Sequence, residues 1–159
     1  MNNNLELFKN CIEAFKNLKE FQIILSIGKI LNVKDLGELP ENIFAFSYVP
    51  QLQVLKQTDI FITHGGISSI NEAILLKNLP LIVIPQDFDQ FDNAKQIEKY
   101  GAGIALDNKN INPEILKKSV FKILEDIDKY QRLKPFVKVL KKQERKEKKY
   151  LKNFLVNQN

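Results

Sequence analysis

The only histidine of the 159-residue sequence, His64, stands directly before the glycine pair 65–66, with Ser68 and Ser69 following. Glycines let a ligand approach the backbone closely, and the start of a helix offers free N–H groups and the positive end of its dipole. This combination suits an anion such as phosphate, with the imidazole and the Ser69 hydroxyl as side-chain donors. The alternative is structural, because Ser69 and Glu72 have the spacing of a capping box and the glycines would then only form a turn.

A second polar cluster, Asp89 and Gln90, follows an apolar run, with Asn93 one helical turn further on. A carboxylate accepts hydrogen bonds from two hydroxyls, and an amide both donates and accepts. Such a pair can read the hydroxyls of a sugar, and Asn93 would face the same way. The alternative is again structural, since Asp is a common residue at helix starts.

An aromatic residue, Tyr48, precedes the segment Val-Pro-Gln at 49–51. Its ring is either part of the core and rim or a platform on which a base stacks, a contact worth about 1–3 kcal/mol. We expect no metal site, because His64 has no second histidine or cysteine nearby and Cys11 is the only cysteine. A serine-histidine-aspartate triad is not indicated either, since no serine occupies a strand-to-helix elbow.

The elements that must position these residues alternate between helix and strand. Apolar residues recur at helical spacing over residues 4–19 and again over about 113–126. Between them we expect strands at 21–28, 42–50, 59–65, 80–85 and 102–106, and helices at 51–58, 68–78 and 89–101. Strands that are apolar on both faces indicate a parallel sheet, and the predicted fold class is α/β, a Rossmann-like parallel sheet with helices on both faces. The polar clusters then follow the carboxyl ends of strands, where such sheets bind ligands.

The positive charge is concentrated at the end of the chain. The segment from Lys129 to Lys152 holds 11 of the 24 basic residues against Glu144 and Glu147, a net charge of +9, which leaves −4 for the rest. We therefore divide the chain into a Rossmann-like domain over residues 1–127 and basic C-terminal helices over residues 128–159. The tail is either a solvated helix face or a surface for anionic lipid or a partner.

No secretory signal and no apolar run of about 20 residues is found in the sequence. With one cysteine no internal disulfide can form. We therefore expect a cytoplasmic protein, with peripheral contact at the inner face of the membrane as an open option. No nucleic-acid partner is expected.

Residues 48–106 contain, in register, the runs V-P-Q, T-H-G-G, S-x-x-E-A, P-x-x-x-P, D-Q-x-x-N-A and G-A-G. Together they resemble the donor-binding signature of family 1 glycosyltransferases, the UDP-glycosyltransferases that include bacterial macrolide and antibiotic glycosyltransferases. The resemblance implies the C-terminal half of a GT-B fold. It also implies a UDP-sugar, UDP-glucose or a related one, as donor substrate, with no cofactor and no metal.

The resemblance also implies a role for each matching residue. The base would be held at the start of the signature, the ribose at the glutamate of S-x-x-E, the diphosphate at the histidine and the donor sugar at the D-Q pair. The implied base and ribose residues are Tyr48, Val49, Gln51 and Glu72; those for the diphosphate are His64, Gly66, Ser68 and Ser69; those for the sugar are Asp89 and Gln90.

Three positions depart from the family pattern. Ser68 stands where many relatives have asparagine, which removes one phosphate-side contact. Tyr48 replaces a tryptophan, which reduces the stacking area. Asn78 replaces the glycine that ends a helix, a substitution that asparagine tolerates because it adopts the left-handed conformation.

The resemblance does not extend to an acceptor domain with its histidine base, so no catalytic residue is expected in this chain. The strand that opens the donor domain in the family has no counterpart either, so the sheet is expected to lack its first strand. The implied function is the donor half of an inverting hexosyltransferase that acts on a hydroxyl of a lipophilic acceptor, with the chain alone inactive. Its partner would be an N-terminal acceptor domain on the same gene or on a separate subunit. The alternative is a non-catalytic interaction subunit that uses the basic tail; sugar-nucleotide epimerases share the fold but not the D-Q-x-x-N-A run.

Overall fold

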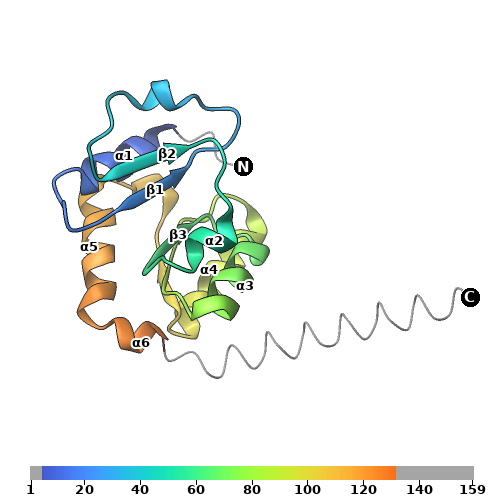
Figure 1. Cartoon of the computed structure of the whole chain (residues 1–159). Coiled ribbons are helices and arrows are strands. Elements are labelled where there is room, and N and C mark those ends of the chain that lie inside the picture. The colour runs from blue at the N-terminus through green and yellow to red at the C-terminus, as the bar shows by residue number, and fades with distance from the viewer. Residues whose placement is uncertain (1–4, 132–159) are drawn as a thin grey trace, which may run out of the picture.

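The computed structural model describes residues 5–131 (Figure 1). Within them helices and strands alternate, as the sequence predicts. The elements are α1 (Leu5–Phe15), β1 (Ile23–Ser26), the 3-10 helix η1 (Val33–Leu36), β2 (Ile43–Phe46), α2 (Gln51–Leu55), β3 (Phe61–Thr63), α3 (Ile67–Lys77), β4 (Leu81–Val83), α4 (Phe88–Lys99), β5 (Gly103–Ala105), the 3-10 helix η2 (Asn108–Asn110), α5 (Pro113–Glu125) and α6 (Ile127–Gln131).

All strand pairs of the described residues are parallel, but they form two sheets. β1 pairs with β2, and β4 lies between β3 and β5. No ladder joins β1 to β3 within residues 5–131. This division agrees with the expectation that the sheet lacks one of its strands.

Strand β4 shows that helices cover both faces of the second sheet. Ile82 and Ile84 pack in one core cluster with residues of α1 and α5, whereas Leu81 and Val83 pack in a second cluster with residues of α3 and α4. Since side chains alternate across a strand, the two clusters lie on opposite faces. The predicted α/β fold with a parallel sheet and two helix layers is therefore confirmed.

The helix ends follow local sequence. Asn112 caps α5, because its side chain accepts from the N–H of Ile115 at 2.9 Å, and Pro113 occupies the first helical position. Asn78 ends α3 in the left-handed region at φ 51°. The predicted replacement of a helix-ending glycine by Asn78 is thus confirmed.

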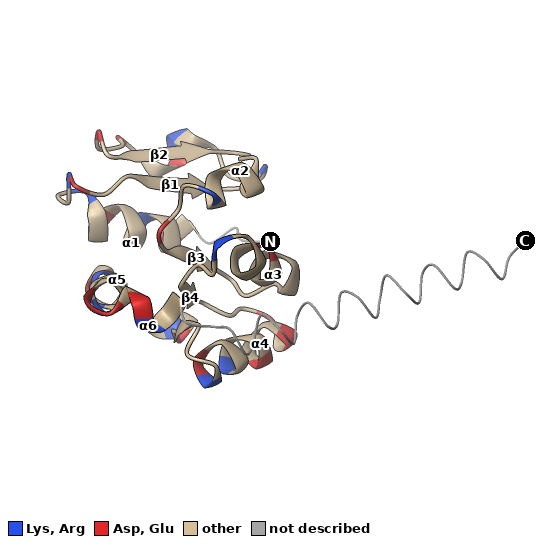
Figure 2. Cartoon of the chain, turned by 60° about the horizontal axis from the view of Figure 1, so that its bottom comes forward, with Lys and Arg blue, Asp and Glu red and all other residues tan. Residues whose placement is uncertain are grey.

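The C-terminal part of the described residues packs on the first core cluster. α6 begins at Ile127, and Tyr130 is buried in the cluster that contains residues of α1 and α5. The predicted basic helices over 128–159 lie outside the described residues except for 128–131. Within the described residues the positions of Lys and Arg alternate along the chain with those of Asp and Glu, as the coloured ribbon of Figure 2 shows.

Candidate functional site

The loop after β3 leads directly into α3. Gly65 has φ 92°, a left-handed conformation that glycine adopts without strain, and Gly66 is the N-cap of α3. The N–H groups in the first turn of any helix lack intrahelical acceptors, and here no side chain caps them. The structure therefore has an uncapped helix N-terminus of an 11-residue helix at the position where the sequence predicts an anion site.

His64 lies half-buried beside this helix start. A Cβ built on Gly66 would lie 2.8 Å from the imidazole Nε2, so the ring tip is close to the N-cap. Burial lowers the pKa of His64, while the carboxylates of Asp87 and Asp89 act in the opposite direction. A histidine with a lowered pKa is mainly neutral at pH 7 and carries one ring N–H that can donate a hydrogen bond.

The structural alternative, a capping box formed by Ser69 and Glu72, is wrong. α3 begins at Ile67, earlier than predicted, so Ser69 is its third residue rather than its cap. Glu72 instead accepts from Gln51 Nε2 at 2.7 Å, and the same nitrogen lies 3.2 Å from Ser69 Oγ. This bridge from α2 to α3 brings together three of the residues assigned to the nucleoside and diphosphate.

The residues before α2 lie at the carboxyl end of β2. Tyr48 is 72% exposed, so its ring is not part of the core, and Val49 is half-buried. An exposed ring at this end of a strand is available for stacking, whereas the core alternative no longer holds. Its contact with a base stays a prediction.

The loop after β4 has its own capping box, formed by Asp87 and Gln90. Gln90 Oε1 accepts from the N–H groups of Gln86 at 2.9 Å and Asp87 at 3.2 Å, and Gln90 Nε2 lies 3.2 Å from Asp87 Oδ2. The capping alternative for Asp89 is therefore wrong, since α4 begins at Phe88 with Asp87 as its cap. Asp89 is exposed in the first turn of α4, and its carboxylate is free to accept hydrogen bonds.

Asn93 ties the two loops together. Its Nδ2 donates to the carbonyl of Gly65 at 2.9 Å, and a Cβ on Gly65 would lie 3.5 Å from the Gln90 carbonyl oxygen. The histidine loop and the Asp-Gln loop are thus neighbours, as the parallel-sheet argument predicts. The sequence suggested that Asn93 faces a sugar, but in the structure its amide holds the backbone of the histidine loop.

Gln86 is a residue that sequence reasoning missed. It stands in the loop after β4, and its Nε2 is buried without a hydrogen-bond partner among the described residues. A buried donor without a partner is costly, and its place in this loop makes the Gln86 amide a candidate donor to a ligand. The only sequence signal was its position after the strand end, next to Pro85.

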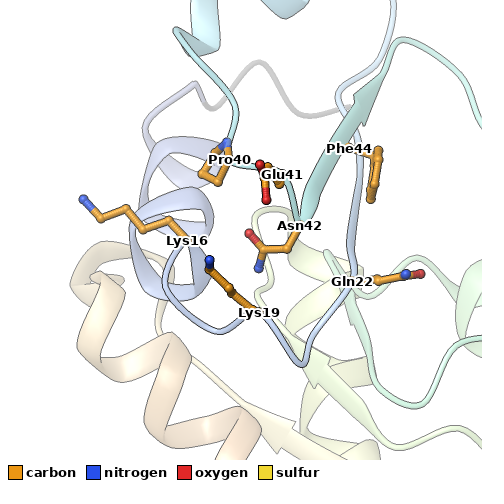
Figure 3. A pocket seen from close by; sticks show the side chains of 7 residues that line it. All are labelled: Lys16, Lys19, Gln22, Pro40, Glu41, Asn42 and Phe44. Carbon is orange, nitrogen blue, oxygen red and sulfur yellow. The ribbon is translucent and has the colours of Figure 1, made fainter.

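A hollow of about 430 Å³ lies elsewhere, at the amino ends of β1 and β2 (Figure 3). Its lining includes Lys16, Lys19 and Asn42, of which Lys16 is paired with Glu13 at 2.9 Å. Asn42 donates to the carbonyls that end α1 and the following turn. Because ligands of parallel sheets bind at the carboxyl ends of strands, we assign the candidate site to the loops and not to this hollow.

Residues 5–131 contain no cluster of three or more His, Cys, Asp or Glu side chains arranged to hold a metal ion. In the same part of the chain no helix has the length and apolar character needed to cross a bilayer.

A family model, similar proteins and a similar solved structure all indicate glycosyltransferases. Residues 5–152 match the glycosyltransferase family 28 C-terminal domain. The chain is 37% identical over 125 residues to an uncharacterized UDP-glucosyltransferase, YojK, of Bacillus subtilis strain 168, covering 79% of this chain and 30% of that protein. It is 32% identical over 127 residues to the oleandomycin glycosyltransferase of Streptomyces antibioticus, covering 80% of this chain and 29% of the relative.

A solved structure of the glycotransferase of kitacinnamycin superposes with a TM-score of 0.81 at 33% identity, covering 89% of this chain and 36% of that one. The chain therefore spans about a third of the length of the proteins that it matches. The matched family, the relatives and the parallel-sheet fold agree with the signature read from the sequence. The chain belongs to the glycosyltransferase family 28 C-terminal domain family, and it corresponds to the C-terminal domain of family 1 glycosyltransferases that have the GT-B fold.

Proposed function

We propose that this chain is the donor-binding half of an inverting hexosyltransferase and that it binds a UDP-sugar such as UDP-glucose. The observation that carries the proposal is the junction of two loops, in which Asn93 Nδ2 bonds to the carbonyl of Gly65 at 2.9 Å beside the start of α3. This junction brings the uncapped start of α3 and the exposed carboxylate of Asp89 to one edge of the sheet, which supports the proposal.

The diphosphate is assigned to the start of α3. The N–H groups after Gly66, the ring N–H of His64 and the hydroxyls of Ser68 and Ser69 are donors, and the helix dipole favours a negative charge there. When the bond from the sugar to the diphosphate breaks, negative charge grows on the leaving group. Donors already fixed at this position stabilise that charge without a metal ion.

The nucleoside is assigned to α2 and the residues before it. Glu72 is held by Gln51 at 2.7 Å, which fixes one carboxylate oxygen and leaves the other to accept from ribose hydroxyls. Tyr48, exposed at 72%, offers its ring face to the uracil, with Val49 beside it. These contacts hold the donor in place and do not take part in bond breaking.

The donor sugar is assigned to the start of α4. Asp89 presents an exposed carboxylate to the sugar hydroxyls. Gln90 is 8% exposed, and its Oε1 is used by the loop, so only one Nε2 hydrogen remains for a ligand. We therefore assign the main hydroxyl contacts to Asp89 and a supporting contact to Gln90.

The acceptor half is assigned to a separate domain, on the same gene or on a partner subunit. Large apolar side chains are exposed around the candidate site: Phe88 at 96%, Leu52 at 51% and Ile67 at 50%. Apolar side chains in such a position suit a surface that another domain covers. The chain alone would bind the donor without transferring the hexose. The acceptor would be a hydroxyl of a lipophilic small molecule or lipid. The reaction would take place in the cytoplasm or at the inner face of the membrane.

The test is calorimetric titration of the full chain with UDP, UDP-glucose and free glucose. We expect binding of both nucleotides, tighter for UDP-glucose, and none for free glucose. Replacing Asp89 with Asn should remove the advantage of UDP-glucose over UDP and leave UDP binding unchanged. The matched control is Asp92→Asn, one turn later on the same exposed helix face, which should keep both affinities.

Two results would contradict the proposal. One is the absence of heat at millimolar UDP from a chain shown to be folded by circular dichroism. The other is an equal loss of UDP-glucose binding in the Asp89 and Asp92 variants, which would mean that the start of α4 does not hold the sugar.

A further inference from the structure

Gln86 carries an unusual group in the loop after β4. Among the side-chain atoms of residues 5–131 that are buried without a hydrogen-bond partner, its Nε2 is the only donor. The others are the amide oxygens of Asn71 and Asn78 on α3 and at its end. Unpaired N–H groups are rarer in protein interiors than carbonyl oxygens with unused lone pairs. The Gln86 donor therefore stands out from these groups.

The hydrogen bonds that hold this loop do not use the Gln86 side chain. Gln90 Oε1 accepts from the backbone N–H groups of Gln86 and Asp87 at 2.9 Å and 3.2 Å, and Gln90 Nε2 lies 3.2 Å from Asp87 Oδ2. A different side chain at position 86 would leave all these bonds in place. The Gln86 amide is thus not needed to build the loop.

One end of the Gln86 amide reaches the surface. The residue is half-buried and its side chain makes no hydrogen bond within the described residues, yet only the nitrogen is among the buried unpartnered atoms. The oxygen end is therefore the accessible one. A half-turn about the last side-chain torsion, whose energy profile is broad and roughly two-fold, exchanges the two atoms and brings the NH₂ group to the surface.

We propose that Gln86 is a specificity-determining residue that donates a hydrogen bond to a hydroxyl of the donor sugar, so that the site favours a fully hydroxylated hexose over a deoxyhexose. This inference rests on the proposed function, because it requires a nucleotide sugar at the junction of the two loops. The carboxylate of Asp89, exposed in the first turn of α4, can only accept hydrogen bonds, whereas the Gln86 amide can donate them. A sugar hydroxyl does both, so the two side chains complement one another.

Gln86 supplies the donor that Gln90 offers only in part. Gln90 is 8% exposed, and its Nε2 already lies against Asp87 Oδ2. Both Nε2 hydrogens of Gln86 are unused within the described residues. A sugar that lacks the matching hydroxyl leaves this donor unpaired, and a site built to bond a hydroxyl discriminates against the analogue without it.

The first test is calorimetric titration of the full chain with UDP, UDP-glucose and the monodeoxy forms of UDP-glucose. Gln86→Met keeps the length of the side chain and removes its N–H groups. We expect it to bind UDP as the wild type does and UDP-glucose roughly 3- to 10-fold more weakly. Removing one particular hydroxyl from the sugar should weaken binding to the wild type but not to Gln86→Met, as expected for two groups that bond to one another. The matched control is Gln96→Met on the exposed face of α4, which should change nothing.

The second test needs no ligand. Gln86→Met removes a buried donor that has no partner and replaces it with an apolar group, so the melting temperature of the ligand-free chain should rise above that of the wild type. Gln96→Met should melt with the wild type. A lower melting temperature for Gln86→Met would contradict the proposal, because it would mean that the amide has a partner within the folded chain.

Two binding results would also overturn the proposal. One is an unchanged preference for UDP-glucose over UDP in Gln86→Met. The other is an equal loss of UDP and UDP-glucose, which would move the amide contact from the sugar to the nucleotide. If the wild type binds no UDP, the proposed function fails and the sugar contact fails with it. The melting comparison still decides separately whether Gln86 holds an unpaired donor.

Discussion

The contact between Gly66 and His64 gives a direct way to test how the histidine takes part in donor binding. Gly66 has φ −62° and ψ 134°, a conformation open to alanine, so Gly66→Ala introduces no backbone strain. The new Cβ would lie 2.8 Å from Nε2 of His64. Ordinary contacts are about 3.5 Å or longer, so the ring tip must move by roughly 0.7 Å.

The expected effect on folding is small, because the moving group is the end of a side chain. An off-rotamer ring costs about 0.5–1.5 kcal/mol. The effect on binding is larger, since a hydrogen bond to a charged phosphate contributes about 1.5–3 kcal/mol. At 1.4 kcal/mol for each factor of ten, UDP should bind about 10- to 150-fold more weakly.

The assay is calorimetric titration with UDP for the wild type, Gly66→Ala, His64→Ala and the double variant, with thermal unfolding as the check on stability. We expect the two single variants to lose similar affinity and the double variant to lose little more. Gly65→Ala is the contrast, because φ is 92° and its Cβ would lie 2.7 Å from Val83 Cγ1, so it should lower the melting temperature. Wild-type affinity in Gly66→Ala, or additive losses in the double variant, would refute the role assigned to the ring.

Three further predictions concern pH, packing and the thiol. Burial lowers the pKa of His64 below its ordinary value of 6.5, so the unfolded state binds the proton more tightly. The free energy of unfolding should therefore have its full value above about pH 6.5 and fall as the pH drops below it. In urea unfolding measured over a series of pH values, His64→Gln should remove this fall. A Cβ on Gly103 would collide with the backbone of Leu81, so Gly103→Ala should lower the melting temperature markedly. Gly37→Ala is the control: a Cβ there meets no other atom, so this variant should lose only the stability that corresponds to the strain of a positive φ. Burial raises the pKa of Cys11 to about 12, so a thiol reagent should label the native chain far more slowly than the urea-unfolded chain, and equal rates would contradict the packing of α1.

Much of the fold follows from periodicity alone. The alternation of apolar strands and amphipathic helices predicts the element order and the parallel sheet, and β4 is buried on both faces as its unbroken apolar run indicates. Helix starts were less predictable, because serine and aspartate are common caps and several candidates stand close together. The structure selects Gly66 and Asp87, where the sequence suggested Ser69 and Asp89.

In the candidate site, too, residue spacing predicts which residues come together, whereas their hydrogen-bond partners depend on tertiary packing. Following the strands to their carboxyl ends placed His64 and Asp89 at one edge of the sheet. The sequence does not reveal that the Gln90 amide is used within its own loop, since this depends on the turn at Gln86 and Asp87. The bond from Asn93 to Gly65 joins residues 28 positions apart, and no local pattern indicates it.

The central claim is that the loops after β3 and β4 bind the diphosphate and sugar of one donor molecule. The most direct measurement is a two-dimensional amide NMR titration of the full chain with UDP-glucose. We predict that the amides of residues 64–69 and 86–90 shift together with one dissociation constant, and that the residues lining the hollow at the amino ends of β1 and β2 do not shift. Shifts confined to that hollow, or none at millimolar ligand in a folded chain, would contradict the account.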